Sequence, residues 1–256
     1  HDDFKKFPGH WKDGKLYSVM VRFGLLGVSY NTKAVSDAEA ASYKCFWKPE
    51  LKGKVGHFDW HLPNLGQISL YNGNGKNLWN LDKGQWDKVK ATAKTLRPQV
   101  GGFFDYGGTF NGLKTGEMLA MAGIGDWITG VLERDGAPVK SVIPKEGGIQ
   151  FTESYSIGKG SSKAAIVKKF IQYMMSPEGQ VKSANMAAYP ANIVTNKGRK
   201  ALQDKNPKEA QRSNQVDGSP LDPVKLIKDG RIQYRDIPRQ QSLEEWNDFW
   251  QEYKSA

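Results

Sequence analysis

Aromatic and acidic residues stand together at several predicted loop junctions of this sequence, and that combination suits the binding of a positively charged amine. The aromatic members are Trp60, Trp127, Phe151 and Tyr189, and the acidic members near them are Asp59, Asp126 and Glu153. The face of an aromatic ring attracts a cation, and a carboxylate pairs with it. Because a single aromatic residue is more often a packing residue, the hypothesis of an amine site depends on the grouping.

The patterns for metal binding and catalysis are incomplete. His57 and His61 have the HxxxH spacing with Asp59 between them, but the Glu of the HExxH zinc motif is missing and Pro63 follows at once. No third ligand is obvious, so we predict ordinary polar histidines and no metal site. The GKGSSK stretch at 158–163 does not satisfy the phosphate-loop pattern, and the sequence contains no GxSxG hydrolase elbow.

The charge and composition of the chain limit its class. The formal net charge is +10 and charged residues make up 25% of the sequence, which raises the hypothesis of a nucleic-acid partner. Lysine and arginine are dispersed among Asp and Glu, however, and the longest like-charge runs are pairs such as Lys168-Lys169, so we expect no nucleic-acid groove. No apolar run approaches the length that spans a bilayer, so no membrane insertion is expected. Cys45 is the sole cysteine and is predicted to be a core residue.

Helix and strand signals alternate along the chain, which predicts an α/β fold. Strands are predicted at 16–22, 25–31, 54–59, 117–124, 138–144 and 153–158, with Gly24 between the first two. Helices are predicted from Pro63, from the cap Asp82 to Pro98, from the cap Asp126 to Gly136, over 163–175, from Pro177, and from a capping box of Ser242 and Glu245. Two of these helices carry apolar stripes that we expect to be buried. The stripes are Ala164, Val167, Phe170, Ile171 and Met174 in one helix, and Trp246, Phe249, Trp250 and Tyr253 in the other.

Five segments in this order resemble the periplasmic solute-binding proteins of ABC importers, in particular the spermidine/putrescine-binding branch. They are FGLLGVSYNTKAV (23–35), FWKPELKGKVGHFD (46–59), LRPQVGGFFD (96–105) with LKTGEMLAMAGIGD (113–126), PKEGGIQFTESYSIGKGSS (144–162), and FIQYMMSPEGQVKSANMAAYPANI (170–193). The combination of PKEGG, a following acidic-Ser pair, SPE and a YP turn is specific, although no single piece would suffice.

The resemblance implies a two-lobed type II periplasmic binding protein fold, with the ligand in the cleft between the lobes. Members of the family begin about 90–100 residues before a strand like 16–22, so we expect the N-terminal part of one lobe to be absent from this chain. The expected first lobe, incomplete, comprises 1–26 and 152–198, and the second comprises 27–151 and 199–256.

The resemblance also assigns ligand contacts. The Trp-x-Asp that follows the PKEGG turn in the family corresponds to Phe151 and Glu153 here, and Asp126 matches the family's Gly-Asp. The tyrosine of the YP turn is Tyr189, and the late glutamine is Gln233. Gly123 stands where the family has a tryptophan, with Trp127 close by. Two family acids fall near Trp60 and Pro63, where only Asp59 is acidic. The depletion of acids favours a smaller amine or an amino-acid-like zwitterion over a long polyamine.

The resemblance therefore implies a periplasmic binding protein without enzymatic activity or cofactor. It would capture a small amine-bearing solute, deliver it to an ABC transporter permease, and act as a monomer whose export signal has been removed. Two alternatives from other classes are a hydrolytic enzyme that uses Asp59, Asp126 or Glu153, and a basic nucleic-acid-binding protein.

Overall fold

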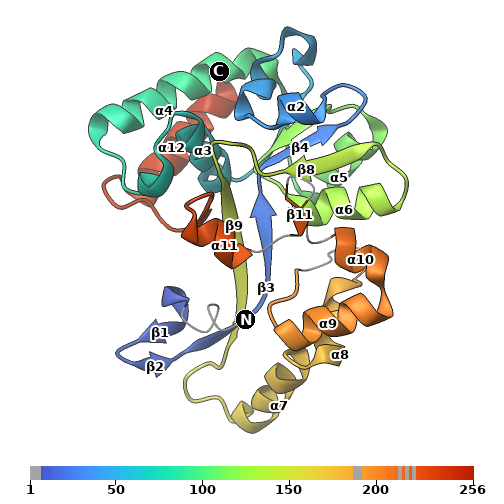
Figure 1. The fold of residues 1–256 in the computed structure, drawn as a ribbon. Helices are drawn as coiled ribbons and strands as arrows, with labels where there is room; N and C mark the ends of the chain where they lie inside the picture. The colour runs from blue at the N-terminus through green and yellow to red at the C-terminus, as the bar shows by residue number, and fades with distance from the viewer. Residues whose placement is uncertain (1–6, 187–191, 213–214, 217–218, 221–222) are drawn as a thin grey trace. The chain divides into compact units, whose positions relative to one another are not determined.

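A computed structural model describes residues 7–186, 192–212, 215–216, 219–220 and 223–256 (Figure 1). The chain divides into two compact units, of which unit 1 contains His1–Gly24 and Phe151–Val224 and unit 2 contains Leu25–Gln150 and Lys225–Ala256. Strands β3 (Ser18–Leu26) and β9 (Gly148–Ser156) each contain a boundary between the units. Helices and sheets are both present, which confirms the predicted α/β class.

Unit 2 is built on a five-stranded sheet in the order β6-β5-β7-β4-β8. Its strands are β4 (Val28–Asn31), β5 (Val55–Phe58), β6 (Val100–Phe104), β7 (Ala120–Ala122) and β8 (Val139–Val142). Strand β5 runs parallel to β6 and β7, whereas β4 runs antiparallel to β7 and β8. The carboxyl ends of β5, β6 and β7 therefore meet at one edge of the sheet, where ligands bind in open α/β sheets.

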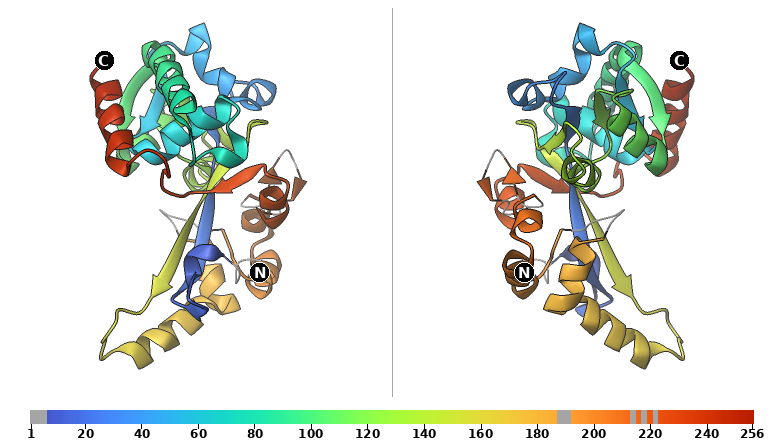
Figure 2. Two further views of the ribbon diagram at one scale, coloured as in Figure 1. Left: turned by 90° about the vertical axis from the view of Figure 1, so that its left-hand side faces the viewer. Right: turned by 90° about the vertical axis from the view of Figure 1, so that its right-hand side faces the viewer.

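The helices of unit 2 follow from capped amphipathic sequences. They are α2 (Asp37–Ala40), α3 (His61–Tyr71), α4 (Lys83–Leu96), α5 (Tyr106–Thr115), α6 (Asp126–Arg134) and α12 (Leu243–Ser255), with 3-10 turns at Tyr43–Trp47, Pro49–Leu51, Gly75–Asn77 and Arg97–Gln99. As predicted, Asp82 caps α4, where it forms a capping box with Gln85. Ser242 caps α12, whose predicted aromatic stripe is buried. Helix α12 contacts α3 and α4 and lies on the outer side of the unit in both views of Figure 2.

Unit 1 contains a short hairpin, part of β3 and β9, and a group of helices. The hairpin is β1 (Trp11–Lys12) with β2 (Lys15–Leu16), preceded by a 3-10 turn at Pro8–His10, and the helices are α7 (Ala164–Met174), α8 (Pro177–Ala184), α9 (Asn196–Lys205) and α10 (Pro207–Arg212). Strands β10 (Gln215–Val216) and β11 (Ser219–Pro220) pair with each other, and α11 (Pro223–Lys228) contains the third boundary between the units. The Gln180 amide ties α8 to β3, because it donates to the carbonyl of Val21 at 3.1 Å and accepts from the backbone N–H of Val194 at 2.9 Å.

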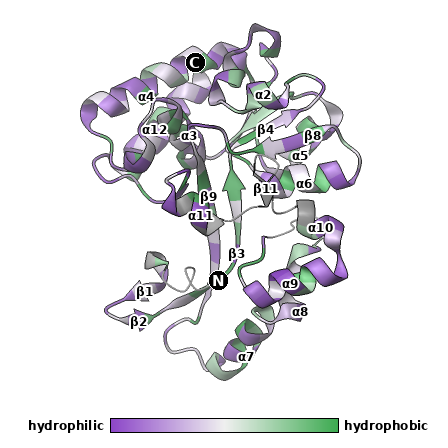
Figure 3. Cartoon of the chain, viewed as in Figure 1, coloured by the Kyte–Doolittle hydropathy of each residue, from purple (hydrophilic) through white to green (hydrophobic). Residues whose placement is uncertain are grey.

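The expected burial of the apolar stripe of α7 is wrong. No residue of this helix is buried, and Phe170 is 50% exposed. Green and purple residues alternate along α7 in Figure 3. Of the nine large hydrophobic side chains that are exposed in the described residues, seven belong to unit 1: Trp11, Leu16, Tyr17, Ile166, Phe170, Tyr173 and Met186. The described part of unit 1 therefore leaves apolar surface uncovered.

Several predicted boundaries differ from the structure. Helix α9, which packs on α8 and α10, spans the proposed lobe limit at residue 198 and lies within unit 1; the division into lobes stays a prediction. Strand β3 continues through Gly24, since glycine is compatible with an extended backbone, and the expected break is absent. Helix α3 begins at His61 rather than Pro63. The predicted strand at 117–124 is limited to Ala120–Ala122.

Candidate ligand site

The carboxyl edge of β5, β6 and β7 collects most of the predicted site residues of unit 2. Asp59 and Trp60 follow β5, Asp105 follows β6, and Gly123–Asp126 follows β7. The parallel arrangement of these strands places all three connections at the same edge. Gln233 lies on β12 (Ile232–Tyr234), which runs parallel to β9 in a three-stranded sheet of order β12-β9-β3.

A cation of the protein itself lies over the ring of Trp60. The guanidinium carbon of Arg235 is 4.4 Å from the ring centroid, and the ring of Phe58 meets Trp60 edge-on at 6.4 Å. Arg235 follows β12, and its backbone N–H donates to the carbonyl of Gln150 at 2.9 Å. Sequence reasoning missed Arg235, because nothing in the local pattern GRIQYRD indicates that it meets a residue 175 positions earlier.

The Asp59 carboxylate forms hydrogen bonds with two side chains of α12. Its Oδ1 accepts the indole N–H of Trp250 at 2.8 Å, and its carboxylate pairs with Nζ of Lys254 at 2.8 Å. Burial raises the pKa of Asp59, but the hydrogen bonds from Lys254 and Trp250 lower it by more, so the net change is a decrease. These contacts give Asp59 an anchoring role between the end of β5 and the C-terminal helix.

Behind Trp60, a buried polar network fixes the start of α3. The amide nitrogen of Asn64 donates to the carbonyls of Phe58 and Trp60 at 2.7 and 2.8 Å, so its oxygen must face Nδ1 of His57, 2.6 Å away. Nδ1 therefore carries the proton, and Nε2 accepts from the hydroxyl of Tyr253 at 3.1 Å. Burial lowers the pKa of His57 to about 4, so this imidazole is neutral at pH 7.

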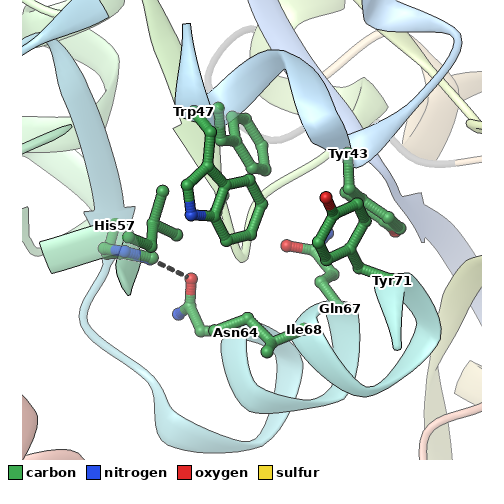
Figure 4. A pocket seen from close by; sticks show the side chains of 10 residues that line it. Tyr43, Trp47, His57, Asn64, Gln67, Ile68 and Tyr71 are labelled. Atoms are coloured by element: carbon green, nitrogen blue, oxygen red, sulfur yellow. Dashed lines mark hydrogen bonds between the residues drawn. The ribbon is translucent and has the colours of Figure 1, made fainter. Parts of the chain in front are cut away.

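The same network borders a small cavity in unit 2. In Figure 4, Trp47 faces Asn64 and Ile68 across the cavity, with His57 on one side and Tyr43, Gln67 and Tyr71 on the other. The Trp47 and Tyr71 rings stack at 4.7 Å. The cavity has a volume of ≈ 10 Å³ for a water-sized sphere, which is room for about one water molecule. It is therefore too small to be the site of an organic solute.

The remaining predicted residues of unit 2 make internal contacts. Asp126 is the first residue of α6 rather than its cap, which is Gly125, and its Oδ1 accepts the backbone N–H of Leu25 at 3.2 Å. Trp127 packs against the core cluster of Leu113, Met118, Met121, Ile124, Ile128, Leu132 and Val139. The side-chain amide of Gln233 donates to the carbonyl of Gly230 at 3.2 Å.

Gly123 cannot carry the tryptophan that the resemblance would place there. Its φ is +76°, and a Cβ atom would lie 2.5 Å from the amide nitrogen of Asn64. Its own N–H donates to Oε1 of Gln67 at 2.8 Å. The close contact of Gly123 with Asn64 and Gln67 of α3 therefore requires glycine at this position, where the family has tryptophan.

In unit 1, the predicted aromatic-acid pair is already joined to a cation. Phe151 is buried, and Oε2 of Glu153 accepts from Nε of Arg22 at 2.6 Å. Both partners keep partial solvent contact, with 17% of the Arg22 side chain and 39% of the Glu153 side chain exposed. Tyr189 lies outside the described residues.

Within the residues that the structure describes, no group of three or more His, Cys, Asp and Glu side chains is arranged to hold a metal ion. Over the same residues, no helix has the length and apolar character needed to cross a bilayer.

Comparison with known proteins gives a consistent picture. A family model for bacterial extracellular solute-binding proteins matches residues 2–208. The spermidine/putrescine-binding periplasmic protein of Escherichia coli K12 is 27% identical over 187 residues, which are 71% of this chain and 51% of that protein. The chain thus spans about half the length of the curated relatives that it matches.

Solved structures share the fold at low sequence identity. The spermidine/putrescine ABC transporter substrate-binding protein PotD from Streptococcus pneumoniae matches with a TM-score of 0.72 at 16% identity, covering 94% of this chain and 70% of that one. The Atu4243-GABA receptor matches with a TM-score of 0.70 at 19% identity, covering 94% and 69%. With the family model matched over more than three quarters of its length, the chain belongs to the bacterial extracellular solute-binding protein family.

Proposed function

We propose that this protein captures a small amine-bearing solute, a polyamine or an amino-acid-like zwitterion, in the periplasm and delivers it to the permease of an ABC transporter. The observation that carries the proposal is the family match over residues 2–208. The names of similar proteins, which refer to spermidine, putrescine and GABA, support an amine as the ligand class. In this proposal the protein binds its solute and does not catalyse a reaction.

The proposed ligand contacts in unit 2 are Trp60, Trp127, Asp126 and Gln233, and those in unit 1 are Phe151, Glu153 and Tyr189. Asp59 supports them indirectly, because its carboxylate is bound by Trp250 and Lys254. A cation–ring contact is worth up to about 2 kcal/mol and a charged hydrogen bond about 1.5–3 kcal/mol. Micromolar affinity requires about 8 kcal/mol, so a few such contacts supply much of it.

The two alternatives gain no support from the site. A hydrolase needs an acid or base poised for proton transfer, whereas Asp59, Asp126 and Glu153 each bind a group of the protein itself. A nucleic-acid-binding protein needs a basic patch, whereas many lysines pair with neighbouring acids on the same helix, as Lys83, Lys182 and Lys225 do.

We propose further that units 1 and 2 correspond to the two lobes of the family fold and that unit 1 is the incomplete one. The exposed apolar side chains gathered in unit 1 support this assignment. So does the length of the curated relatives, of which this chain covers about half.

A solute panel tests the function. The melting temperature of the full chain is measured with putrescine, spermidine, 4-aminobutyrate and glutamate, with sodium chloride at matched ionic strength as the control for a chain of net charge +10. A ligand present at one hundred times its Kd stabilises the folded state by about 2.7 kcal/mol, so a true ligand gives a clear shift. Isothermal calorimetry then gives the affinity. A panel in which no solute shifts the melting temperature beyond the salt control would refute the proposal.

A further inference from the structure

The turn that follows α3 contains two of the three Asn-Gly pairs of this sequence. The pairs are Asn72-Gly73 and Asn74-Gly75 in the turn, and Asn111-Gly112 inside α5. In such a pair, the backbone nitrogen after the asparagine can attack the side-chain amide, because glycine has no Cβ to hinder the approach. All three pairs share this local sequence, so the surrounding structure determines which of them reacts.

The backbone N–H of Gly75 is available for this attack. Within the described residues, it donates to no protein acceptor. The φ of Gly75 is +41°, which glycine adopts easily, and a Cβ atom placed there would meet nothing within 4 Å. The turn therefore has space to rearrange as this nitrogen approaches the amide of Asn74.

The contacts of Asn74 hold its side chain only lightly. Its Nδ2 donates to the hydroxyl oxygen of Ser69 at 2.9 Å, and its backbone N–H donates to the carbonyl of Ser69 at 3.1 Å. A single hydrogen bond between neutral groups contributes little to holding an amide in place. These contacts leave the nitrogen of Gly75 unengaged.

The other two glycine nitrogens are engaged in hydrogen bonds. The N–H of Gly73 donates to the carbonyl of Leu70 at 2.9 Å, and Oδ1 of Asn72 accepts from the hydroxyl of Thr92 on α4 at 3.0 Å. Gly112 is buried within α5, where its N–H belongs to the backbone hydrogen bonding of the helix. Attack on Asn72 therefore requires a hydrogen bond to break, and attack on the asparagine before Gly112 requires the helix to open.

We propose that Asn74 is a site of spontaneous deamidation in the folded protein. The nitrogen of Gly75 gives up its proton to solvent and forms a bond with Cγ of Asn74, while the Cγ–Nδ2 bond breaks and the amide leaves as ammonia with a proton from solvent. Water then opens the resulting succinimide ring. Opening at Cγ gives aspartate, and opening at the main-chain carbonyl carbon gives isoaspartate, in which the backbone runs through the side chain.

The modified turn lies close to the proposed solute site in unit 2. Either product adds a negative charge beside Lys76, and isoaspartate also lengthens the backbone between α3 and Trp79. The indole N–H of Trp79 donates to the carbonyl of Tyr234 at 2.8 Å. Tyr234 belongs to β12, the strand that also carries the proposed ligand contact Gln233.

Peptide mapping by mass spectrometry tests the proposal. The full chain is kept folded at mildly alkaline pH and physiological temperature, sampled over time and digested at mildly acidic pH, so that the digestion itself causes little deamidation. Fragmentation distinguishes Asn72 from Asn74, which cleavage at lysine leaves in one peptide ending at Lys76. The wild type is compared with Asn74→Gln and the matched control Asn72→Gln, and a parallel sample is unfolded in guanidinium chloride. The melting temperature of each variant shows that it is folded.

We expect Asn74 to convert about 2- to 10-fold faster than Asn72 in the folded protein, the range that corresponds to one neutral hydrogen bond, and Asn111 to convert more slowly than either. Asn74→Gln should remove most of the deamidation in the turn, whereas Asn72→Gln should leave the rate at Asn74 unchanged. In guanidinium chloride the three sites should convert at similar rates, because they share the Asn-Gly sequence.

Conversion of Asn72 or Asn111 as fast as Asn74 in the folded protein overturns the proposal. So does a folded Asn74 that stays unmodified while the unfolded chain converts. The proposed function stands in either case, because this experiment uses no solute.

Discussion

The buried imidazole of His57 makes the stability of unit 2 depend on pH in a defined window. The side chain is fully buried, donates through Nδ1 to Asn64 and accepts through Nε2 from Tyr253. A second proton, on Nε2, would place a charge in the core away from water, and the nearby Arg97 also opposes that charge. The hydrogen bond with Asn64 and the nearby Asp59 favour the charged form, but burial outweighs both.

Burial lowers the pKa of His57 from its ordinary value of 6.5 to about 4 in the folded protein. Because the folded pKa lies below the unfolded one, the unfolded state takes up the proton first as the pH falls. The associated stability is present above pH 6.5 and is lost progressively between pH 6.5 and pH 4. Because the unfolded state binds the proton at a higher pH than the folded state, the free energy of unfolding falls by about 2 kcal/mol between pH 7 and pH 5.

Urea denaturation followed by tryptophan fluorescence measures this effect in unit 2, which holds seven of the eight tryptophans. Between pH 7 and pH 5, the free energy of unfolding should fall by about 2 kcal/mol less in His57→Gln than in the wild type. This difference does not depend on how stable the variant is at pH 7. Carboxylates with lowered pKa values, such as Glu39 and Asp87 at about 2, lose their contribution to stability only below about pH 4.5. Burial also lowers the pKa of His61, but its contribution is the same in both proteins and cancels in the comparison. Identical pH slopes for wild type and His57→Gln between pH 7 and pH 5 would refute the assignment of a buried neutral imidazole.

Three further predictions concern site residues. Glu153→Gln should weaken the binding of an amine by roughly 1.5–3 kcal/mol in calorimetry and should change the free energy of unfolding by less than about 1 kcal/mol, because the ion pair that it removes is partly exposed. Asp59→Asn should cost about 0.5–1.5 kcal/mol of stability in urea, through the lost Lys254 pair, with unchanged solute affinity. Gly123→Ala should cost at least about 1–2 kcal/mol, because its φ is +76° and the new Cβ would meet the Asn64 amide at 2.5 Å.

Matched controls make these predictions decisive. Glu178→Gln also breaks an exposed ion pair in unit 1 and should leave amine affinity unchanged. Asp87→Asn removes paired charges from the surface of α4, and its small cost sets the scale for Asp59. Gly84→Ala is the control for Gly123→Ala. Gly84 lies in α4, and alanine there should stabilise the helix by about 0.5–1 kcal/mol. Equal effects in Gly123→Ala and Gly84→Ala, or a loss of amine binding in Glu178→Gln that matches Glu153→Gln, would contradict the reasoning.

The local rules of helix formation predicted unit 2 well and unit 1 less well. Asp82 and Ser242 cap their helices as expected, and the stripe from Trp246 to Tyr253 is buried, because a cap and an apolar stripe are determined within one helix. Helix α7 has the same kind of stripe, yet its Phe170 remains half-exposed. Burial requires a partner surface, and the sequence of a helix does not show whether that partner is present.

The charge of the candidate site was harder to predict, because each acid beside an aromatic residue is bound by a distant group of the protein. Glu153 pairs with Arg22, 131 residues away, Asp126 accepts from Leu25, 101 residues away, and Asp59 pairs with Lys254, 195 residues away. No local spacing indicates contacts of this range, so the sequence pattern of rings and acids predicted an amine site but not the internal partners of its acids. Each of these three carboxylates is therefore already engaged inside the protein, and a ligand ammonium group would have to share it with that internal partner.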